Sequence, residues 1–315
     1  MRNWKNSVEV NGYVYSHTLQ VKKTGEHSRV PGTEFITGTV HVAIDDEMLT
    51  VIPVNFGYVT EFFNKKNSDG TQKKNDTFAL LKRLIDNNEV VENVAYGAAG
   101  AMHIRIQGDI ECNDFISRKT GELVSTQRIR GGFAHTGYTS DEKMARFKTD
   151  MLITNYAEKE PENGDPAYGT LSGYVFNFRN DFMPVKFTVR IEGGMKYFED
   201  QDISTAEPML TNVWGDIVNT TVERKVEVET AFGAPSVSST TKSFRSWDIA
   251  GASYEPYDFG AEEVMTREDV QAGLKAREEK LAGLKKNQKD PAANVFAETP
   301  KKAAVVETNS NDYDF

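Results

Sequence analysis

The sequence contains a single cysteine, Cys112, among its 315 residues. A lone thiol excludes a disulfide framework and any metal site built from several thiolates. Long apolar runs are missing too. No stretch of about 18 apolar residues occurs, so we expect no membrane-spanning helix. No apolar segment follows the charged N-terminus, so we expect no signal peptide and predict a cytoplasmic protein.

Motifs typical of catalysis are also missing. The five histidines show no paired spacing of the kind that holds zinc. Gly97-Ala98-Ala99-Gly100 is not followed by the Lys-Ser/Thr pair of a phosphate loop. The acidic stretch Asp45-Asp46-Glu47 lies between two predicted strands, where a plain turn is the usual structure. We therefore predict no metal, no cofactor and no enzymatic activity, with a nuclease subunit that uses the acidic turn as a weaker alternative.

The chain has no surplus of basic residues. Its 37 Lys and Arg stand against 47 Asp and Glu, a net charge of −10, whereas nucleic-acid-binding domains are usually basic. The acidity is not evenly spread, however. Residues 1–150 carry 19 basic and 19 acidic side chains, and residues 151–260 carry 9 and 17. The net charge therefore does not exclude nucleic-acid binding, but it limits where on the chain such binding could occur.

The first half has β periodicity interrupted by one helix. Apolar residues alternate in the strands, and apolar spacing at i, i+3, i+6 and i+7 indicates the helix. Three strands, a helix and a two-stranded hairpin follow one another, which is the element order of an OB-fold, a five-stranded barrel. The predicted elements are strands at 7–23, 34–44 and 49–60, a helix at 76–88, and strands at 102–112 and 125–139.

The second half is β-rich with weaker patterns. Strands are predicted at 169–179, 183–192, 210–220, 225–232 and 241–252. A second OB-like barrel fits this series, with its helix missing or reduced to 199–207. The stretch 267–286 has helical spacing, and Thr266 with Asp269 forms an approximate capping box at its start.

These patterns predict a mainly β protein with four parts. The charged, proline-containing segment 157–167 is interpreted as a boundary. From residue 287 onward few large apolar groups remain, so disorder is expected. The predicted parts are an OB-fold domain at 1–156, a second β-rich domain at 168–260, a helix at 265–286 and a disordered tail at 287–315 with an acidic tip.

Three short segments resemble single-stranded-DNA-binding proteins of bacterial and phage replication. They are Asn11-Gly12-Tyr13-Val14, the strand entry Gly32-Thr33-Glu34-Phe35-Ile36-Thr37-Gly38, and the terminal Asn311-Asp312-Tyr313-Asp314-Phe315. The extra β region favours a phage-type member. The resemblance implies that the tip, with Asp312, Tyr313, Asp314 and Phe315, recruits replication or recombination proteins. Family members carry Ile-Pro before the final Phe, and this chain has Tyr-Asp there, which leaves the partner open.

Proteins that bind single strands need exposed aromatic faces for the bases and cations for the phosphates. The first half offers both, on predicted outer strand faces and on the loops that flank the binding face of OB-folds. Some of these aromatic residues are expected in the core, because one sequence does not fix the register. The predicted binding residues are Tyr13, Tyr15, Lys22, Lys23, Arg29, Phe35, His41, Tyr58, Lys65, Lys66, Arg118, Lys119, Arg128 and Arg130.

The sequence thus predicts non-catalytic, sequence-independent binding of single-stranded DNA in replication, recombination or repair. The alternative is a structural β-protein of a phage virion or assembly that does not bind DNA. The sequence leaves the oligomeric state open, and it does not decide whether the second β-rich region binds DNA or serves assembly.

Overall fold

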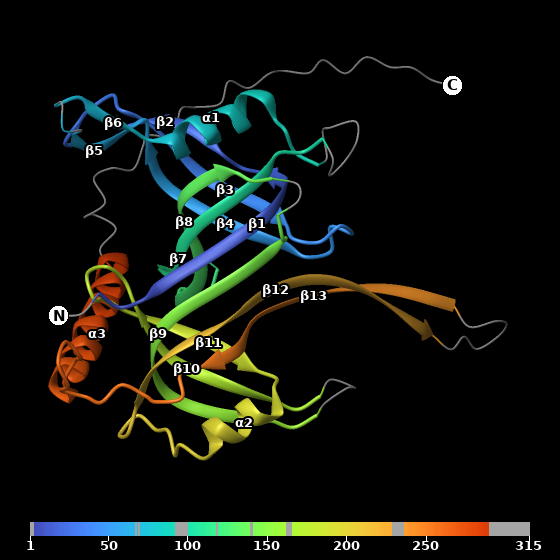
Figure 1. Cartoon of the computed structure of the whole chain (residues 1–315), viewed down its shortest axis with the longest axis vertical. Coiled ribbons are helices and arrows are strands. Elements are labelled where there is room, and N and C mark those ends of the chain that lie inside the picture. Colours follow the sequence, from blue (N-terminus) through green and yellow to red (C-terminus); the bar gives the residue numbers. More distant parts are fainter. Residues whose placement is uncertain are drawn as a thin grey trace.

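Strands dominate the computed structural model, which describes residues 3–66, 68, 70–91, 100–117, 119–138, 141–161, 166–228 and 236–289. Figure 1 shows an upper and a lower group of strands, with a helix on the outside of each group and a third helix at one side. The mainly β class predicted from the sequence is confirmed.

The upper group is a closed ring of five strands, here called barrel 1. Strand β1 pairs with both β3 and β7, β3 pairs with β4, and β7 pairs with β8. A parallel contact between β4 and β8 closes the ring, as the OB-fold order requires. The predicted five-stranded ring is confirmed, with strands β1 (Asn6–His17), β3 (Glu34–Ala43), β4 (Val51–Thr60), β7 (His103–Ile116) and β8 (Leu123–Thr136).

Helix α1 (Asp76–Asn87) lies where the sequence predicts it, between β4 and β7. The Asn75 side chain caps it by accepting a hydrogen bond from the Thr77 N–H at 3.2 Å. The helix ends at Asn88, which has a positive φ of 51°. Phe78, Leu81 and Leu84 form its buried face, which packs on barrel 1. Two short elements precede it, β5 (Phe62–Lys66) and β6 (Gln72–Lys74), and β2 (Gln20–Lys23) extends the edge of β3.

The lower group forms a second ring, barrel 2, with the same connectivity. Strand β9 pairs with β10 and β12, β10 pairs with β11, and β12 pairs with β13. A parallel contact between β11 and β13 closes it. Its strands are β9 (Met144–Lys159), β10 (Tyr168–Phe176), β11 (Phe182–Val189), β12 (Met209–Val228) and β13 (Ser236–Ala252), and helix α2 (Glu192–Glu199) lies between β11 and β12.

Barrel 2 corrects three sequence predictions. The helix expected at 199–207 begins earlier, at Glu192, and two long strands replace the three expected between 210 and 252. The expected domain boundary at 156 falls inside β9, because residues 157–159 still pair with β10, and 160–167 connect the two strands within barrel 2. Strands β12 and β13 continue past the barrel as a two-stranded arm (Figure 1).

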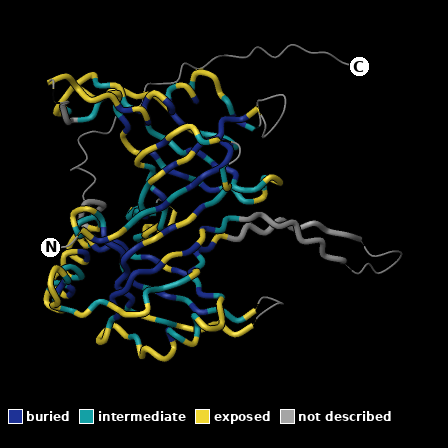
Figure 2. Tube along the Cα trace, in the orientation of Figure 1, coloured by how far each residue is buried: buried dark blue, intermediate teal, exposed yellow. Residues whose placement is uncertain are grey.

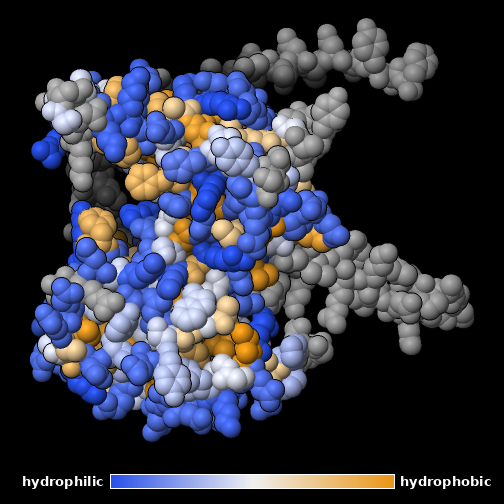
Figure 3. Space-filling model, viewed as in Figure 1, coloured by the Kyte–Doolittle hydropathy of each residue, from blue (hydrophilic) through white to orange (hydrophobic). Residues whose placement is uncertain are grey.

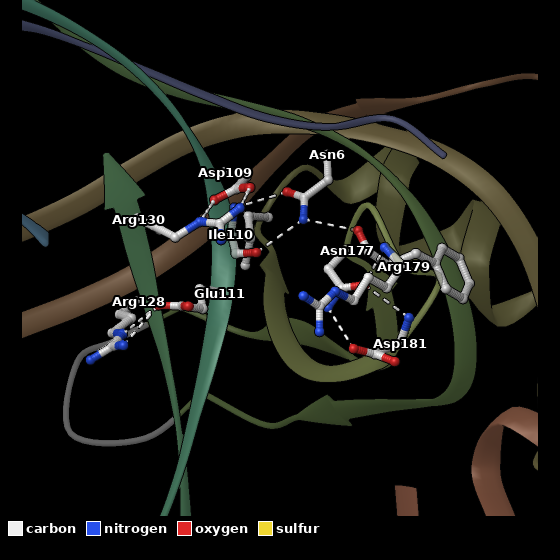
Figure 4. A network of polar contacts seen from close by, with 10 residues as sticks. Asn6, Asp109, Ile110, Glu111, Arg128, Arg130, Asn177, Arg179 and Asp181 are labelled. Atoms are coloured by element: carbon white, nitrogen blue, oxygen red, sulfur yellow. Dashed lines mark hydrogen bonds and ion pairs between the residues drawn. The ribbon is translucent and has the colours of Figure 1, made fainter. Parts of the chain in front are cut away.

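The two barrels are joined through their first strands. Residues Asn6 to Asn11 of β1 pair antiparallel with Met144 to Thr149 of β9, so both rings belong to one continuous sheet. One cluster of buried side chains runs through both, and Figure 2 shows buried segments in each. The Asn6 side chain adds a cross-link. Its Nδ2 donates to the carbonyls of Ile110 and Phe176, and its Oδ1 accepts from the Ile110 N–H at 2.8 Å (Figure 4).

Helix α3 (Arg267–Lys289) packs against both barrels. Its predicted start is confirmed, since Thr266 and Asp269 exchange backbone-to-side-chain hydrogen bonds. The Arg277 guanidinium donates to the Asp114 carboxylate of β7 at 2.7 Å and to the Phe182 carbonyl of β11. Gly273 lies so close to the Phe182 ring that a larger residue would collide with it.

The Arg277–Asp114 pair is almost fully buried, with side chains 7% and 3% exposed. Burial alone would raise the pKa of Asp114. Hydrogen bonds from Arg277 and Ser125 outweigh burial and lower the pKa to about 2. A carboxyl whose pKa is depressed on folding stabilises the folded state above its ordinary pKa, and this stability is lost as the pH falls through the folded value.

We predict that the stability advantage of the wild type over Asp114→Asn shrinks by about 2 kcal/mol between pH 5 and pH 2. Urea unfolding at a series of pH values measures it. An advantage that stays constant over this range would show that the carboxylate does not gain its charge stabilisation from Arg277.

Candidate nucleic-acid interface

A wide groove, here called the central groove, crosses from barrel 1 to barrel 2. Its volume is about 2360 Å³. The loop before β3, the end of β4 and the middle of β7 and β8 line it from barrel 1. Segments 146–148 of β9 and 214–216 of β12 line it from barrel 2. The sheet that joins the barrels therefore forms part of its floor.

Exposed aromatic rings stand along this groove. Tyr58 is 58% exposed, Phe133 52% and Trp214 38%, although large aromatic side chains are usually well buried. Their positions are fixed by neighbours. Tyr58 lies against Phe35 with ring centroids 4.7 Å apart, and Phe133 lies near Phe63 at 6.4 Å. The groove thus presents flat apolar faces that solvent can reach.

Trp214 is held by barrel 2. Its indole packs on the backbone of Gly251, where a Cβ atom would clash with the ring. The ammonium of Lys148, its cross-strand partner, lies 5.3 Å from the ring centroid. A ring beside a cation is the combination that a nucleotide needs, one group for the base and one for the phosphate.

Five glycines line the groove: Gly57, Gly108, Gly131, Gly132 and Gly215. At Gly108 and Gly131 the missing Cβ permits close approach of Arg130 backbone and of the Phe56 ring. Gly57 differs, because nothing lies within 4 Å of the Cβ position there. Bare backbone on the groove surface leaves room for a ligand to approach closely.

Charges in the groove are largely paired. Arg130 forms a bidentate ion pair with Asp109, and Arg146 contacts Glu142 at 2.7 Å and Asp216 at 3.5 Å. Figure 4 shows the Arg130–Asp109 pair beside the Arg128–Glu111 pair on strands β7 and β8. Arg29 on the loop before β3 and Lys148 on β9 bring further positive charge to the lining. The groove is therefore mixed in charge and not strongly basic.

The predicted exposure of Tyr13 is wrong. Its side chain is only 7% exposed and lies 5.1 Å from the His103 ring. The connection between the barrels covers it, with the Lys143 ammonium 5.2 Å from the Tyr13 ring. A pattern of alternation within one strand does not reveal that a later segment crosses its outer face.

The remaining predicted aromatic and histidine positions are divided. Tyr58 lines the central groove, and half-buried Phe35 supports it. Tyr15 is half-buried and does not line the groove. His41 lies on another face, where its Nδ1 is 3.3 Å from the Ser16 hydroxyl oxygen and burial lowers its pKa.

Of the predicted cations, two line the groove, Arg29 and Arg130. Lys22, Lys23 and Lys119 are exposed outside its lining, with Lys23 3.3 Å from Glu34. Arg128 is paired with Glu111 at 2.8 Å, and Arg130 is paired with Asp109, because β7 places a carboxylate opposite each arginine. Arg118, the side chains of Lys65 and Lys66, and the tip residues Asp312, Tyr313, Asp314 and Phe315 lie outside the described residues.

Sequence reasoning missed Phe63, Phe133 and Trp214. Phe133 follows Gly131-Gly132, and Trp214 precedes Gly215. A large ring beside glycine within a strand was an available signal, because glycine in a strand often marks the close approach of a ligand or another backbone.

The acidic turn has a structural role. Both carboxylate oxygens of Asp45 accept backbone N–H groups, from Leu49 at 3.0 Å and Thr50 at 2.6 Å. Asp46 pairs with Lys143 at 2.6 Å. In the described part of the chain, no group of three or more His, Cys, Asp or Glu side chains is arranged to hold a metal ion. The same residues include no helix long and apolar enough to cross a membrane.

The family model described as YorF matches residues 5–287, and the chain belongs to that family. No curated protein matches it. Similar solved structures include a deletion mutant and the wild-type form of the single-stranded DNA binding protein from Thermus aquaticus. The mutant is 12% identical with a TM-score of 0.47, over 83% of this chain and 100% of that one. The wild type is 12% identical with a TM-score of 0.45, over 83% and 99%.

Tyr13 and Tyr58 are both predicted from the sequence to bind DNA, but Tyr13 is buried and Tyr58 is exposed. We predict that Tyr13→Ala lowers the free energy of unfolding by about 3 kcal/mol, because a buried ring is lost. Tyr58→Ala should change it by less than about 0.5 kcal/mol, since the ring is at the surface. Urea denaturation of both variants provides the measurement, and equal losses would contradict the assignment of Tyr13 to the interior.

Proposed function

We propose that this protein binds single-stranded DNA, without catalysis and with little sequence preference, in the central groove. The observation that carries the proposal is the set of solvent-exposed rings of Tyr58, Phe133 and Trp214 along one groove with a glycine-lined surface. Every base has a flat π-face, so stacking on such rings tolerates any sequence and contributes about 1–3 kcal/mol per base.

Barrel 1 supports the same proposal through its topology. In OB-folds the ligand lies over the second and third strands of the ring and the loop between the first two. Those elements correspond here to β3, β4 and the segment 24–33, and residues from all three line the central groove. Trp214 and Lys148 extend the surface onto barrel 2, so the proposed site belongs to both barrels.

The mixed charge of the groove sets the expected salt dependence. Arg29 and Lys148 in the groove, and Lys73 next to Phe63 at 5.8 Å, are the cations we assign to phosphates. Three phosphate contacts on a single strand give a slope of about −2 for log affinity against log salt. The affinity should therefore depend on salt less steeply than that of a strongly basic DNA-binding protein, since base stacking supplies a larger share of the binding free energy.

Removing a ring tests the site. We predict that Tyr58→Ala, Phe133→Ala and Trp214→Ala each weaken binding of labelled oligo(dT) by about 5- to 150-fold, corresponding to about 1–3 kcal/mol per stacked base. Fluorescence anisotropy at about 50 mM salt gives the affinities. Wild-type protein that does not bind oligo(dT) under these conditions would overturn the proposal and favour the structural alternative.

Gly57 permits a matched steric test. Gly57→Gln adds a side chain on the groove lining, and Gly193→Gln adds the same side chain on α2, away from the groove; at both positions nothing lies within 4 Å of the new Cβ atom. We expect weaker binding only for Gly57→Gln, with both variants as stable as the wild type. Equal DNA affinities for the two variants would show that the bound DNA strand does not pass over Gly57.

We also propose that the C-terminal tip recruits other replication proteins. Its support is the sequence alone, an acidic end with a terminal Phe315. Deleting residues 309–315 should leave DNA affinity unchanged or raise it, because carboxylates repel phosphates, while capture of a replication partner is lost. Weaker DNA binding after the deletion would contradict this role.

A further inference from the structure

A second, smaller concavity lies between the barrels, and we call it the inter-barrel hollow. Its volume is about 400 Å³, within the usual range of about 300–1,000 Å³ for small-ligand sites. Barrel 1 contributes His41 of β3, Asn55 of β4 and Arg128 of β8. Barrel 2 contributes Arg245 and Trp247 of β13. The hollow therefore exists only when both barrels are folded and joined.

The charge of the hollow differs from that of the rest of the protein. Arg128 and Arg245 line it, and among the described residues no aspartate or glutamate does. His41 also lines it, but burial lowers the pKa of His41, so the positive charge comes from the arginines. The chain as a whole has a net charge of −10. Arg245 is exposed and forms no ion pair within the described part of the chain, whereas Arg128 is shared with Glu111. A carboxylate-free concavity with an unpaired arginine favours an anion.

The other groups that line the hollow suit a nucleotide. Phe115, near the end of β7, is 42% exposed and offers a ring face. The Asn55 amide bonds to Thr39 and Ile129, and Gln127 Oε1 accepts from the Lys186 N–H, so the donor left over is Gln127 Nε2, which has no partner among the described residues. An aromatic face beside arginines and an amide donor matches the base and the phosphate of one nucleotide.

The hollow adjoins the central groove. Asn55 in the hollow is the ladder partner of Arg130 in the groove, and Arg128 in the hollow is paired with Glu111 in the groove. Arg128 and Arg130 are two residues apart on β8, about 7 Å along the strand. Figure 4 shows these two arginines projecting side by side from β8. On the face visible in Figure 3, apolar side chains form patches among hydrophilic ones.

We infer that the bound DNA strand continues from the central groove into the inter-barrel hollow, an inference that rests on the proposed function. There Arg245 holds a backbone phosphate and Phe115 stacks a base. The group recognised in the hollow is a nucleotide phosphate, and the bound DNA strand supplies it. Binding that reaches the hollow needs a longer oligonucleotide than binding in the groove alone.

The test is a length series of oligo(dT), from about 5 to 20 nucleotides, the range that one or two OB-folds cover. Arg245→Ala and Phe115→Ala are compared with Arg179→Ala and Phe178→Ala, exposed residues on the β10–β11 turn that line neither concavity. We expect wild-type affinity of all four variants for the shortest oligonucleotide that binds. For the longest, Arg245→Ala and Phe115→Ala should lose about 5- to 20-fold, and the two control variants should lose nothing.

Three results would overturn the inference while leaving the proposed function intact. One is wild-type affinity of Arg245→Ala at every length. Another is a loss equal to that of Arg179→Ala, which would reflect only total charge. The third is saturable binding of thymidine monophosphate that depends on Arg245 without any change for oligonucleotides, which would assign the hollow to a free nucleotide. Failure of the wild type to bind any oligonucleotide would instead reject the proposed function.

Discussion

The antiparallel ladder between β1 and β9 is the constraint on which the rest of the structure depends. It places the first strand of one barrel beside the first strand of the other, so that β7, β1, β9 and β12 form one continuous surface. Neighbouring strands lie about 4.8 Å apart. Trp214 on β12 is therefore about 10 Å from β1, two strand spacings away. The groove that spans both barrels follows from this pairing, and Asn6 and helix α3 reinforce it.

The electrostatics of the surface follow from the same sheet. Strand β7 carries Asp109 and Glu111 opposite Arg130 and Arg128 of β8, so these arginines are neutralised where they lie. Exposed pairs of this kind contribute little to stability, about 0–1 kcal/mol each. Their larger consequence is that the groove offers aromatic faces with only a few cations. A chain with a net charge of −10 can bind single strands in this way if stacking supplies much of the affinity.

Much of the fold could be predicted from the sequence, because alternation in β3 and the helical spacing of α1 are local patterns. Barrel 1 follows from them. The extent of barrel 2 does not, since the charged segment after β9 has the composition of a linker but lies within a β-hairpin connection. Tyr13 shows a second limit. Its burial comes from Lys143 and the connection around it, 130 residues further along the chain, and no local pattern records such a contact.

The candidate site was predicted only in part for the same reason. Tyr58, Arg29 and Arg130 do line the central groove, since the end of β4 and the loop before β3 are near each other in any OB-fold ring. Trp214 and Phe133 were missed, although each has a glycine beside it in the chain, because alternation within one strand does not show which rings the fold leaves at the surface. Arg245 and Phe115 meet across the inter-barrel hollow from positions that are distant in sequence.

If the bound DNA strand stacks on rings from both barrels, it covers Trp214 of barrel 2, and tryptophan fluorescence reports this contact. Trp4 and Trp247 are 8% and 7% exposed, whereas Trp214 is 38% exposed and lines the groove. We expect titration with oligo(dT) to quench the emission, and we expect Trp214→Phe to lose most of this quenching. Binding detected by anisotropy without quenching in the wild type, or with equal quenching in Trp214→Phe, would contradict stacking on barrel 2.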